Sequence, residues 1–392
     1  MPGSVTFRFV TNLLMPMSAP STLRRVVVGL DVHKDTIMAS VLDTSSGEIL
    51  ETRPFPNTPD HVIRLVGRLR AQGLEPDCCY EASSCGYVLY YQLRDLGVAC
   101  AVIAPSKIPR RPGDRVKTDR RDAEKLASLY AAGLLTPIQI PDADQEKVRS
   151  LLRCRSDLVG QLVQTRHRTT RLLQARGQVF PKGRNWTLAF GRWLAKVQFE
   201  GVDQVTLTTY LHLITYLEGQ IEALEAELAR QAETDRFKPT VQVLSSFRGV
   251  ALVTALTLAC ELGDIRRFES PRKLMAYVGL VTSEHSSGST IRRGSITRTG
   301  NRHARTALVS AAWRYTHKPV RSDALRLRQA DVGPAVVALA WKAQIRLHKR
   351  FHALAFRKPR PVAAVAVARE FAGFLWAAMQ TLTQPTSHPV AA

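Results

Sequence analysis

Short apolar runs and amphipathic stretches alternate along the first third of the chain. The run RRVVVGLDVH, at residues 24–33, is rich in β-branched side chains and predicts a buried strand that ends near Asp31. Two further runs follow after short turns, and this spacing predicts a three-stranded antiparallel meander. Those runs are residues 35–43 and 47–55.

Helical and extended patterns then alternate up to residue 135. The stretches with helical periodicity are residues 58–73, 84–97 and 117–135, and the short apolar strands are residues 77–82 and 98–105. The resulting order, β-β-β-α-β-α-β-α, predicts a ribonuclease H-like (RuvC-like) α/β fold with two parallel strands beside the first one. Ligand sites in such sheets gather near the carboxyl ends of the strands.

Four carboxylates fall at that edge of the expected sheet. Asp31 ends the first strand and Glu81 ends the fourth. Asp119 and Asp122 open the helix 117–135, close to its apolar stripe, which consists of Ala123, Leu126, Ala127, Tyr130 and Leu134. Carboxylates that converge repel one another unless a cation lies between them. Oxygen ligands suit Mg²⁺ or Mn²⁺, and two such ions suit phosphodiester chemistry, so we predict that all four residues are metal ligands and catalytic residues.

Most of these carboxylates also have an ordinary structural explanation. Asp119 could cap the helix, Asp122 could pair with a neighbouring basic side chain, and Glu81 could simply end a strand. His33 could share one side of the strand with Asp31 and contact a metal or phosphate, although exposed histidines at strand ends are common. An actin-like ATPase is disfavoured, because no glycine follows Asp31 and no phosphate-binding glycine motif is present.

The middle of the chain, residues 141–235, has a helical pattern. Apolar residues recur at three- and four-residue steps in two stretches, which predicts two long helices in a coiled coil with each other or with a second subunit. Residues 147–192 hold eleven lysines and arginines and one acidic residue, which favours a nucleic-acid face. Its candidate contacts are Arg166, Arg168 and Arg171.

The last predicted domain, residues 236–385, is mostly helical and includes a loop rich in serine, glycine and arginine. From residue 291 to residue 321 the chain has eight lysines and arginines and no acidic residue, a composition suited to binding phosphates. The candidate nucleic-acid contacts there are Arg292, Arg293, Arg298 and Arg302. Ser286 and Ser287 lie near these cations, but turn chemistry alone explains serines in a loop.

Composition adds a partner to this picture. The 392 residues are 45% hydrophobic, enough for several folded domains, and carry a net charge of +22. A surplus of that size favours a polyanion, most simply nucleic acid. The six cysteines form no C-x-x-C pair and no zinc-type cluster, so reduced thiols are expected. No apolar run is long enough to predict a membrane span, and residues 1–23 are expected to be a disordered extension.

Several motifs together resemble those of insertion-sequence-110-type transposases, the DEDD recombinases of bacterial mobile elements. They are GLDVHKDTI, YEASSCGY, KTDRRDAEKLA, LMAYVGLVTSEHSSG, GNRHAR and the C-terminal WKAQIRLHKRF with VAVAREFAGFLWA. The resemblance covers nearly the whole chain after residue 24. It departs from the common pattern at Thr282, where proline is usual, and at Ala304, where leucine is usual.

The resemblance implies roles for particular residues. It matches the four acidic positions of a RuvC-like domain to Asp31, Glu81, Asp119 and Asp122. It matches the nucleophile of the C-terminal transposase domain to Ser287, with Ser286 as the alternative register.

The resemblance also implies an activity and its partners. The activity is that of an insertion-sequence transposase, which cuts and rejoins double-stranded DNA through a metal-assisted phosphoserine intermediate. A structured guide RNA, a homo-oligomer (dimer or tetramer) and a cytoplasmic, nucleoid-associated location are further implications. Phe180, Trp186, Trp193 and Tyr210 are compatible with contact to that RNA. The alternatives are a RuvC-like endonuclease that uses water, and a binding protein that regulates its element.

Overall fold

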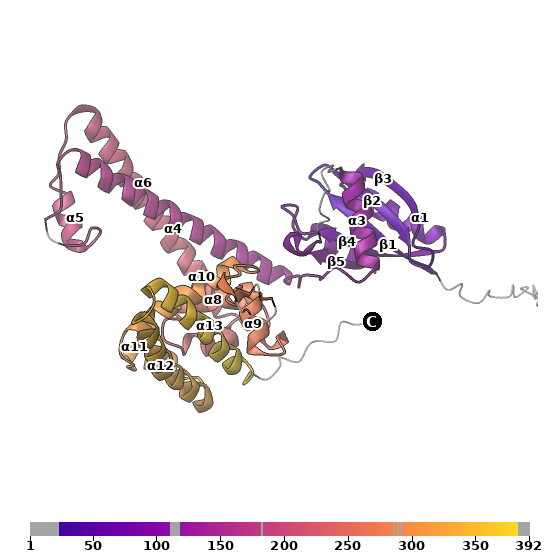
Figure 1. Cartoon of the computed structure of the whole chain (residues 1–392). Helices are drawn as coiled ribbons and strands as arrows, with labels where there is room; N and C mark the ends of the chain where they lie inside the picture. Colours follow the sequence, from indigo (N-terminus) through magenta and orange to yellow (C-terminus); the bar gives the residue numbers. More distant parts are fainter. Residues whose placement is uncertain are drawn as a thin grey trace, which may run out of the picture. The chain divides into compact units, whose positions relative to one another are not determined.

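The computed structural model of the chain describes residues 23–109, 118–181, 183–284, 286, 287, 290 and 292–382. The expected N-terminal extension, except for Leu23, lies outside these residues, as do Lys117, His285 and Gly288. The chain divides into two compact units between Ile140 and Pro141. The first unit is a mixed α/β domain and the second is mostly helical, and each is coloured along the sequence in Figure 1.

A five-stranded sheet forms the centre of the first unit. Its strands are β1 (Arg24–Val32), β2 (Thr36–Asp43), β3 (Ile49–Pro56), β4 (Leu74–Glu81) and β5 (Ala99–Ile103). The strand order is β3-β2-β1-β4-β5, with β1, β2 and β3 antiparallel and with β4 and β5 parallel to β1. The predicted meander and the two parallel additions are therefore confirmed.

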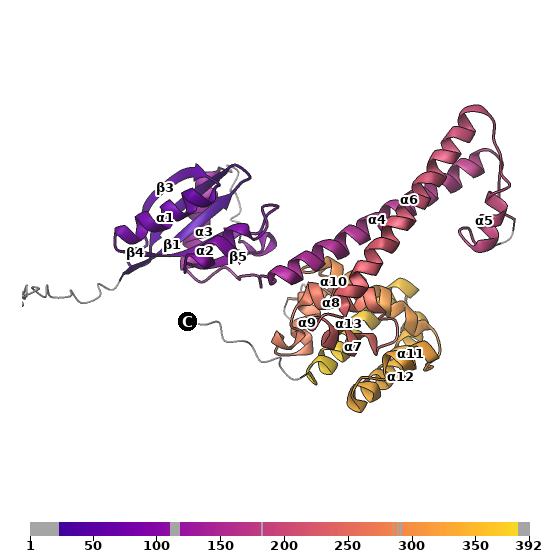
Figure 2. The same ribbon diagram turned by 180° about the vertical axis from the view of Figure 1, so that it is seen from behind.

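Helices cover both faces of this sheet. They are α1 (Pro59–Ala71), α2 (Val88–Asp95), α3 (Asp119–Ala131) and the short 3-10 turn η1 (Pro105–Lys107). The apolar residues of α1 and α2 pack with Val26, Val28 and Leu30 on one face. Helix α3 packs on the opposite face, against Val27 and Cys79. Figure 1 shows α3 on the near face, and Figure 2 shows α1 and α2 from the other side.

Helix α3 lies unusually close to the sheet because β1 has a glycine where the two cross. A Cβ at Gly29 would lie 2.3 Å from the carbonyl oxygen of Ala123 and 2.5 Å from the backbone nitrogen of Ala127. The helix also presents these two alanines, which are fully buried, to the strand. The close approach brings the first turn of α3 to the end of β1, where Asp31 lies.

Gly29→Ala is expected to destabilise the protein by about 3 kcal/mol, because α3 must shift to make room for the new methyl group. Gly67→Ala is the matched control: it lies in the middle of α1 with nothing within 4 Å of its added Cβ. That substitution should raise stability by about 0.5–1 kcal/mol. Urea unfolding of the two variants measures both changes, and a Gly29→Ala protein as stable as the wild type would contradict the close approach.

The helix expected at residues 117–135 is shorter than predicted. Helix α3 ends at Ala131, and Gly133 has a positive φ of 68° that terminates the helical pattern. Leu134, assigned to the apolar stripe from the sequence, therefore lies beyond the helix and is 60% exposed. The remaining stripe residues, from Ala123 to Tyr130, do pack toward the sheet.

The second unit is helical apart from a two-stranded hairpin. Its long helices are α4 (Ala143–Ala175), α6 (Gly201–Ala232), α12 (Pro334–Ala355) and α13 (Arg360–Met379). Its shorter helices are α5 (Leu188–Leu194), α7 (Lys238–Ser245), α8 (Leu252–Leu262), η2 (Ile265–Arg267), α9 (Pro271–Tyr277), α10 (Arg302–Ala312), η3 (Trp313–Thr316) and α11 (Asp323–Arg328). The hairpin strands are β6 (Thr282–Glu284) and β7 (Arg293–Ile296).

Helices α4 and α6 run side by side as one antiparallel pair (Figures 1 and 2). Leu162 packs against Ile214 and Leu217, and ion pairs such as Arg155–Glu225 flank this contact. The two predicted long helices are thus present and pack against each other within one chain. Their pairing as a coiled coil with a second subunit remains a prediction.

Three of the four aromatic residues considered for RNA contact, Phe180, Trp186 and Trp193, pack together at the end of this pair. Phe190 of α5 lies at the centre, with its ring centroid 5.4 Å from that of Phe180, 5.0 Å from that of Trp186 and 5.4 Å from that of Trp193. These three rings therefore contribute to a small core that holds α5 against α4 and α6.

One buried carboxylate ties three helices of the second unit together. Glu261, at the end of α8, accepts hydrogen bonds from Arg153 of α4 at 3.0 Å and from Asn301, which caps α10, at 2.8 Å. Burial alone would raise the pKa of Glu261, but these bonds and the charge of Arg149 outweigh it and hold the pKa below its usual value. The carboxylate thus fixes the start of α10 relative to α4.

Helix α13 closes the helical core, as its apolar sequence predicts. Its buried residues, among them Val367 and Phe371, belong to the largest apolar cluster of the molecule. Among the described residues α13 is the one helix long and apolar enough to cross a membrane, although no such span was expected. Its place in the core accounts for its apolar composition.

Candidate metal centre

The predicted acidic edge is built from β1, β4 and the first turn of α3. Strands β1 and β4 are paired in parallel up to Leu30 and Tyr80, so Asp31 and Glu81 each follow that pair by one residue. Gly29 and Cys79 face α3, since the sulfur of Cys79 lies 3.6 Å from the carbonyl oxygen of Leu126. Side chains alternate along a strand, so Asp31 and Glu81 share the face that α3 covers.

Asp31, His33 and Asp119 converge at this edge. The Nε2 atom of His33 lies 3.3 Å from Oδ2 of Asp31 and 3.5 Å from Oδ1 of Asp119. One ligand atom from each of the three residues lies within 4.8 Å of the other two. Two carboxylate oxygens and an imidazole nitrogen are a donor set that divalent ions such as Mn²⁺ accept. The residues present therefore fit a divalent metal.

The N-terminal cap of α3 is not Asp119, which the sequence suggested as one explanation of that residue. Thr118 caps α3, because its side-chain oxygen accepts the backbone N–H of Arg121. Asp119 is therefore not needed as a cap and turns its carboxylate toward His33 and Asp31. The positive end of the α3 dipole also favours negative charge at this position.

The electrostatics of Asp31 reflect the crowding of negative charge. Burial raises the pKa of the Asp31 carboxyl, and the charges of Asp119 and Asp122 raise it further, while His33 lowers it. Its side chain is 20% exposed, compared with 58% for Asp119. Asp31 is thus more enclosed than Asp119, and a bound cation would relieve the repulsion that it experiences.

The structure gives weaker support for Glu81 and Asp122 as ligands than for Asp31 and Asp119. Asp122 acts on Asp31 through its charge. Glu81 is exposed at the end of β4 and does not belong to the group of three ligand atoms. Their roles as ligands remain predictions.

The sequence suggests His33 as a metal or phosphate contact but does not place it in the predicted ligand set of four acids. The available signal was its spacing, because a residue two positions after Asp31 lies on the same side of an extended chain. The structure places its ring between Asp31 and Asp119, which come from elements far apart in the sequence.

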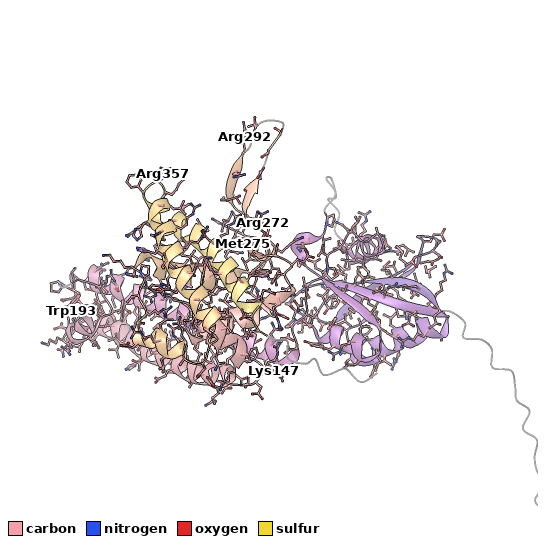
Figure 3. The ribbon with its side chains drawn as sticks, turned by 90° about the horizontal axis from the view of Figure 1, so that it is seen from below. Lys147, Trp193, Arg272, Met275, Arg292 and Arg357 are labelled. Carbon is pink, nitrogen blue, oxygen red and sulfur yellow. The ribbon has the colours of Figure 1, made fainter. Side chains whose placement is uncertain are left out.

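The hairpin of β6 and β7 carries the two candidate nucleophiles, Ser286 and Ser287. The hydroxyl of Ser286 donates a 2.8 Å hydrogen bond to Glu284, which also forms an ion pair with Arg293. Ser287 is exposed and is bound to Thr290 through backbone atoms only, as far as the described residues show. Figure 3 shows Arg292 on this hairpin, which projects from the helical part. Both serines are exposed, but the hydroxyl of Ser286 is held by Glu284.

The arginines predicted to contact nucleic acid differ in whether a carboxylate of the same chain neutralises them. Arg166 forms an ion pair with Glu218 and lies over the ring of Trp186, so part of its charge serves the α4–α6 pair. Arg168 and Arg171 are exposed on α4. Exposed arginines in or beside the β6–β7 hairpin and at the start of α10 are Arg292, Arg293, Arg298 and Arg302.

A five-stranded mixed sheet with carboxylates gathered at its carboxyl edge is consistent with a ribonuclease H-like domain of the DEDD type. Such domains belong to enzymes that cut nucleic acids with divalent metals.

Comparison with known proteins agrees with this class. Residues 28–180 match a family model described as a transposase, of the IS110 DEDD type, and residues 241–326 match the "Transposase IS116/IS110/IS902 family". The protein y4qE of Sinorhizobium fredii, named as a transposase, is 38% identical over 94% of this chain and 92% of its own length. The transposase for insertion sequence element IS1533 of Leptospira borgpetersenii is 32% identical over 84% of this chain and 97% of its own.

The chain therefore belongs to the IS116/IS110/IS902 family of transposases. Membership implies an enzyme that cuts and rejoins DNA for a bacterial insertion sequence, and the DEDD type implies the use of a divalent metal.

Proposed function

We propose that this chain moves its insertion sequence by cutting and rejoining double-stranded DNA with Mg²⁺ or Mn²⁺. The ligands are Asp31, Glu81, Asp119 and Asp122, with His33 completing the set. The observation that carries the proposal is the convergence of Asp31, His33 and Asp119 at the sheet edge. Two bound ions would activate the attacking oxygen and stabilise the leaving oxygen of a phosphodiester.

The side chains of the first unit would hold the ions and orient the DNA phosphate for that reaction. Asp31 lies within the paired part of β1 and its side chain is only 20% exposed, which favours a defined position for its carboxylate. Asp119 completes the edge from the helix, and its exposure leaves room for a DNA phosphate beside it. His33 is half-exposed, so its ring nitrogen can bind the metal or donate a proton to a phosphate oxygen.

Ser287 of the second unit is the proposed nucleophile. Its hydroxyl gives up a proton as the oxygen attacks phosphorus and forms a serine–phosphate bond. The bond from phosphorus to one deoxyribose oxygen breaks, and that oxygen takes up a proton, so no net proton is gained or lost. Rejoining reverses the step with a different DNA hydroxyl, so no external energy source is needed. The choice of Ser287 over Ser286 is supported by the hydrogen bond that ties the hydroxyl of Ser286 to Glu284. Arg292 and Arg293 supply positive charge for the transition state.

The partners follow from the family resemblance. A structured guide RNA selects the DNA by base pairing, and a homo-oligomer, either a dimer or a tetramer, brings the serine of one subunit to the metal centre of another. The exposed Arg168 and Arg171 on α4 are proposed nucleic-acid contacts. The location is cytoplasmic, at the bacterial nucleoid.

A reconstituted recombination assay tests this proposal. It contains the full chain, a duplex that carries the element end, a target duplex and RNA transcribed from the element. With Mg²⁺ present, end-labelled DNA is expected to yield recombinant joints, and with EDTA it should remain uncut. Omitting the RNA should abolish joint formation. Cut ends without joints would favour a nuclease that uses water, and binding without cutting would favour a regulatory protein.

A further inference from the structure

Helix α12 has one face that the metal centre and the serine hairpin do not use. Its inner face, which includes Ala340, Leu347 and Phe351, is buried in the helical core. The opposite face is exposed and strongly basic. We define the basic strip as the exposed cations of this face and of the turn into α13, namely Lys342, Lys349, Arg350, Arg357, Lys358 and Arg360.

The strip is a concentrated positive charge and not an ordinary solvated surface. The chain has no acidic residue between Lys342 and Arg369, whereas solvated helix faces usually mix both signs. Within the described part of the chain, no member of the strip has a carboxylate partner. Arg346, on the same face, does have one, because it forms an ion pair with Glu370 of α13. The strip therefore lacks neutralisation within its own chain.

An aromatic side chain stands at the end of the strip. Phe356 is 89% exposed, although it follows the last residue of α12 directly and precedes Arg357 and Lys358. Figure 3 shows Arg357 just beyond the end of α12, pointing away from the neighbouring helices. A large ring left in water between cations is the arrangement with which proteins contact bases beside phosphates.

We propose that the basic strip and Phe356 bind double-stranded DNA, with the cations on phosphates and the ring against a base step. From Lys342 to Arg357 the strip is about 22 Å long at 1.5 Å per helical residue. A duplex presents about 13 phosphate charges over that length. The choice of DNA as the polyanion rests on the proposed function. The strip lies outside both family-matched ranges, which end at residues 180 and 326.

Binding of the full chain to a fluorescent 30-bp duplex, measured in EDTA over a series of salt concentrations, tests the strip. The triple variant Lys342→Gln, Lys349→Gln and Arg350→Gln should lower the slope of log affinity against log salt by about 2.7, since each phosphate contact contributes about 0.9. These side chains are exposed, so the melting temperature should not change. An unchanged slope would overturn the proposal.

A matched control removes the same charge elsewhere. Arg230→Gln, Lys238→Gln and Arg326→Gln replace three exposed cations that each have a carboxylate partner. This variant should keep the wild-type slope. An equal loss of slope in the control would show that net charge alone, and not the strip, governs binding, and would also overturn the proposal.

Phe356→Ala tests the aromatic contact separately. It should weaken duplex binding about tenfold and leave the salt slope unchanged, because stacking is not electrostatic. If the triple variant of the strip loses affinity for duplex RNA but keeps its affinity for duplex DNA, the surface binds RNA and the DNA assignment is refuted. Because no cutting is scored in EDTA, failure here is distinct from failure to form recombinant joints, which concerns the metal centre and the serine.

Discussion

Asp31→Asn is expected to slow metal-dependent cutting of DNA by about a thousandfold, equivalent to about 4 kcal/mol of transition-state stabilisation. The substitution keeps the size of the side chain but removes a charge from a ligand of the metal centre that is only 20% exposed. An amide oxygen is a weaker ligand for Mg²⁺ than a carboxylate, and the position of the ion is lost with it. Single-turnover cleavage of a labelled duplex measures the effect.

Two controls separate lost chemistry from lost structure. Asp60→Asn removes an exposed carboxylate from the first turn of α1, on the opposite side of the sheet from α3, and should cut DNA at the wild-type rate. In EDTA, Asp31→Asn should melt no lower than the wild type. A carboxyl whose pKa is raised in the folded state costs stability above that pKa, and the substitution removes this cost. Cutting within tenfold of the wild-type rate would exclude Asp31 as a ligand.

Ser287→Ala is expected to abolish the covalent protein–DNA adduct that denaturation traps during cutting. Without the hydroxyl oxygen no bond to phosphorus can form, and recombinant joints should disappear with the adduct. The side chain is exposed on the β6–β7 hairpin, so its loss should not affect folding. Denaturing gels of labelled DNA, treated with protease in a parallel sample, measure the adduct.

Ser286→Ala is the matched control for that variant. It removes the neighbouring hydroxyl and its hydrogen bond to Glu284 but leaves Ser287 in place. The adduct should persist, with at most a modest change in rate. An adduct that survives Ser287→Ala and is lost in Ser286→Ala would exchange the two roles. DNA cutting that continues without any adduct in either variant would support a nuclease that uses water.

The sequence predicts the order of elements well because burial determines it. The run that contains Val26, Val27 and Val28 can only be a buried strand, and the glycine-terminated helical patterns leave little freedom for the first unit. The carboxyl ends of β1 and β4 then lie at one edge by topology. Asp31 and Glu81 are therefore found at that edge without knowledge of any distance.

The remaining features depend on contacts that a linear pattern does not contain. The role of Gly29 follows from the backbone of α3 lying against it, and that of Thr118 from the actual cap geometry. The spacing to Asp31 suggests His33 as a metal contact, but only the structure shows that Asp119 approaches the same ring from another element. Arg166 and Arg168 both lie in the basic stretch of α4, and the sequence does not distinguish them. The structure does, because Glu218 of α6 partly neutralises the charge of Arg166.

Anomalous diffraction from crystals of the full chain soaked in Mn²⁺ tests the central claim most directly. A peak is expected about 2.1 Å from carboxylate oxygens of both Asp31 and Asp119, at the edge where β1 meets the first turn of α3. The same soak of Asp31→Asn crystals should give no peak there. Manganese bound only at other sites, with both carboxylates uncoordinated in the wild-type protein, would contradict the account.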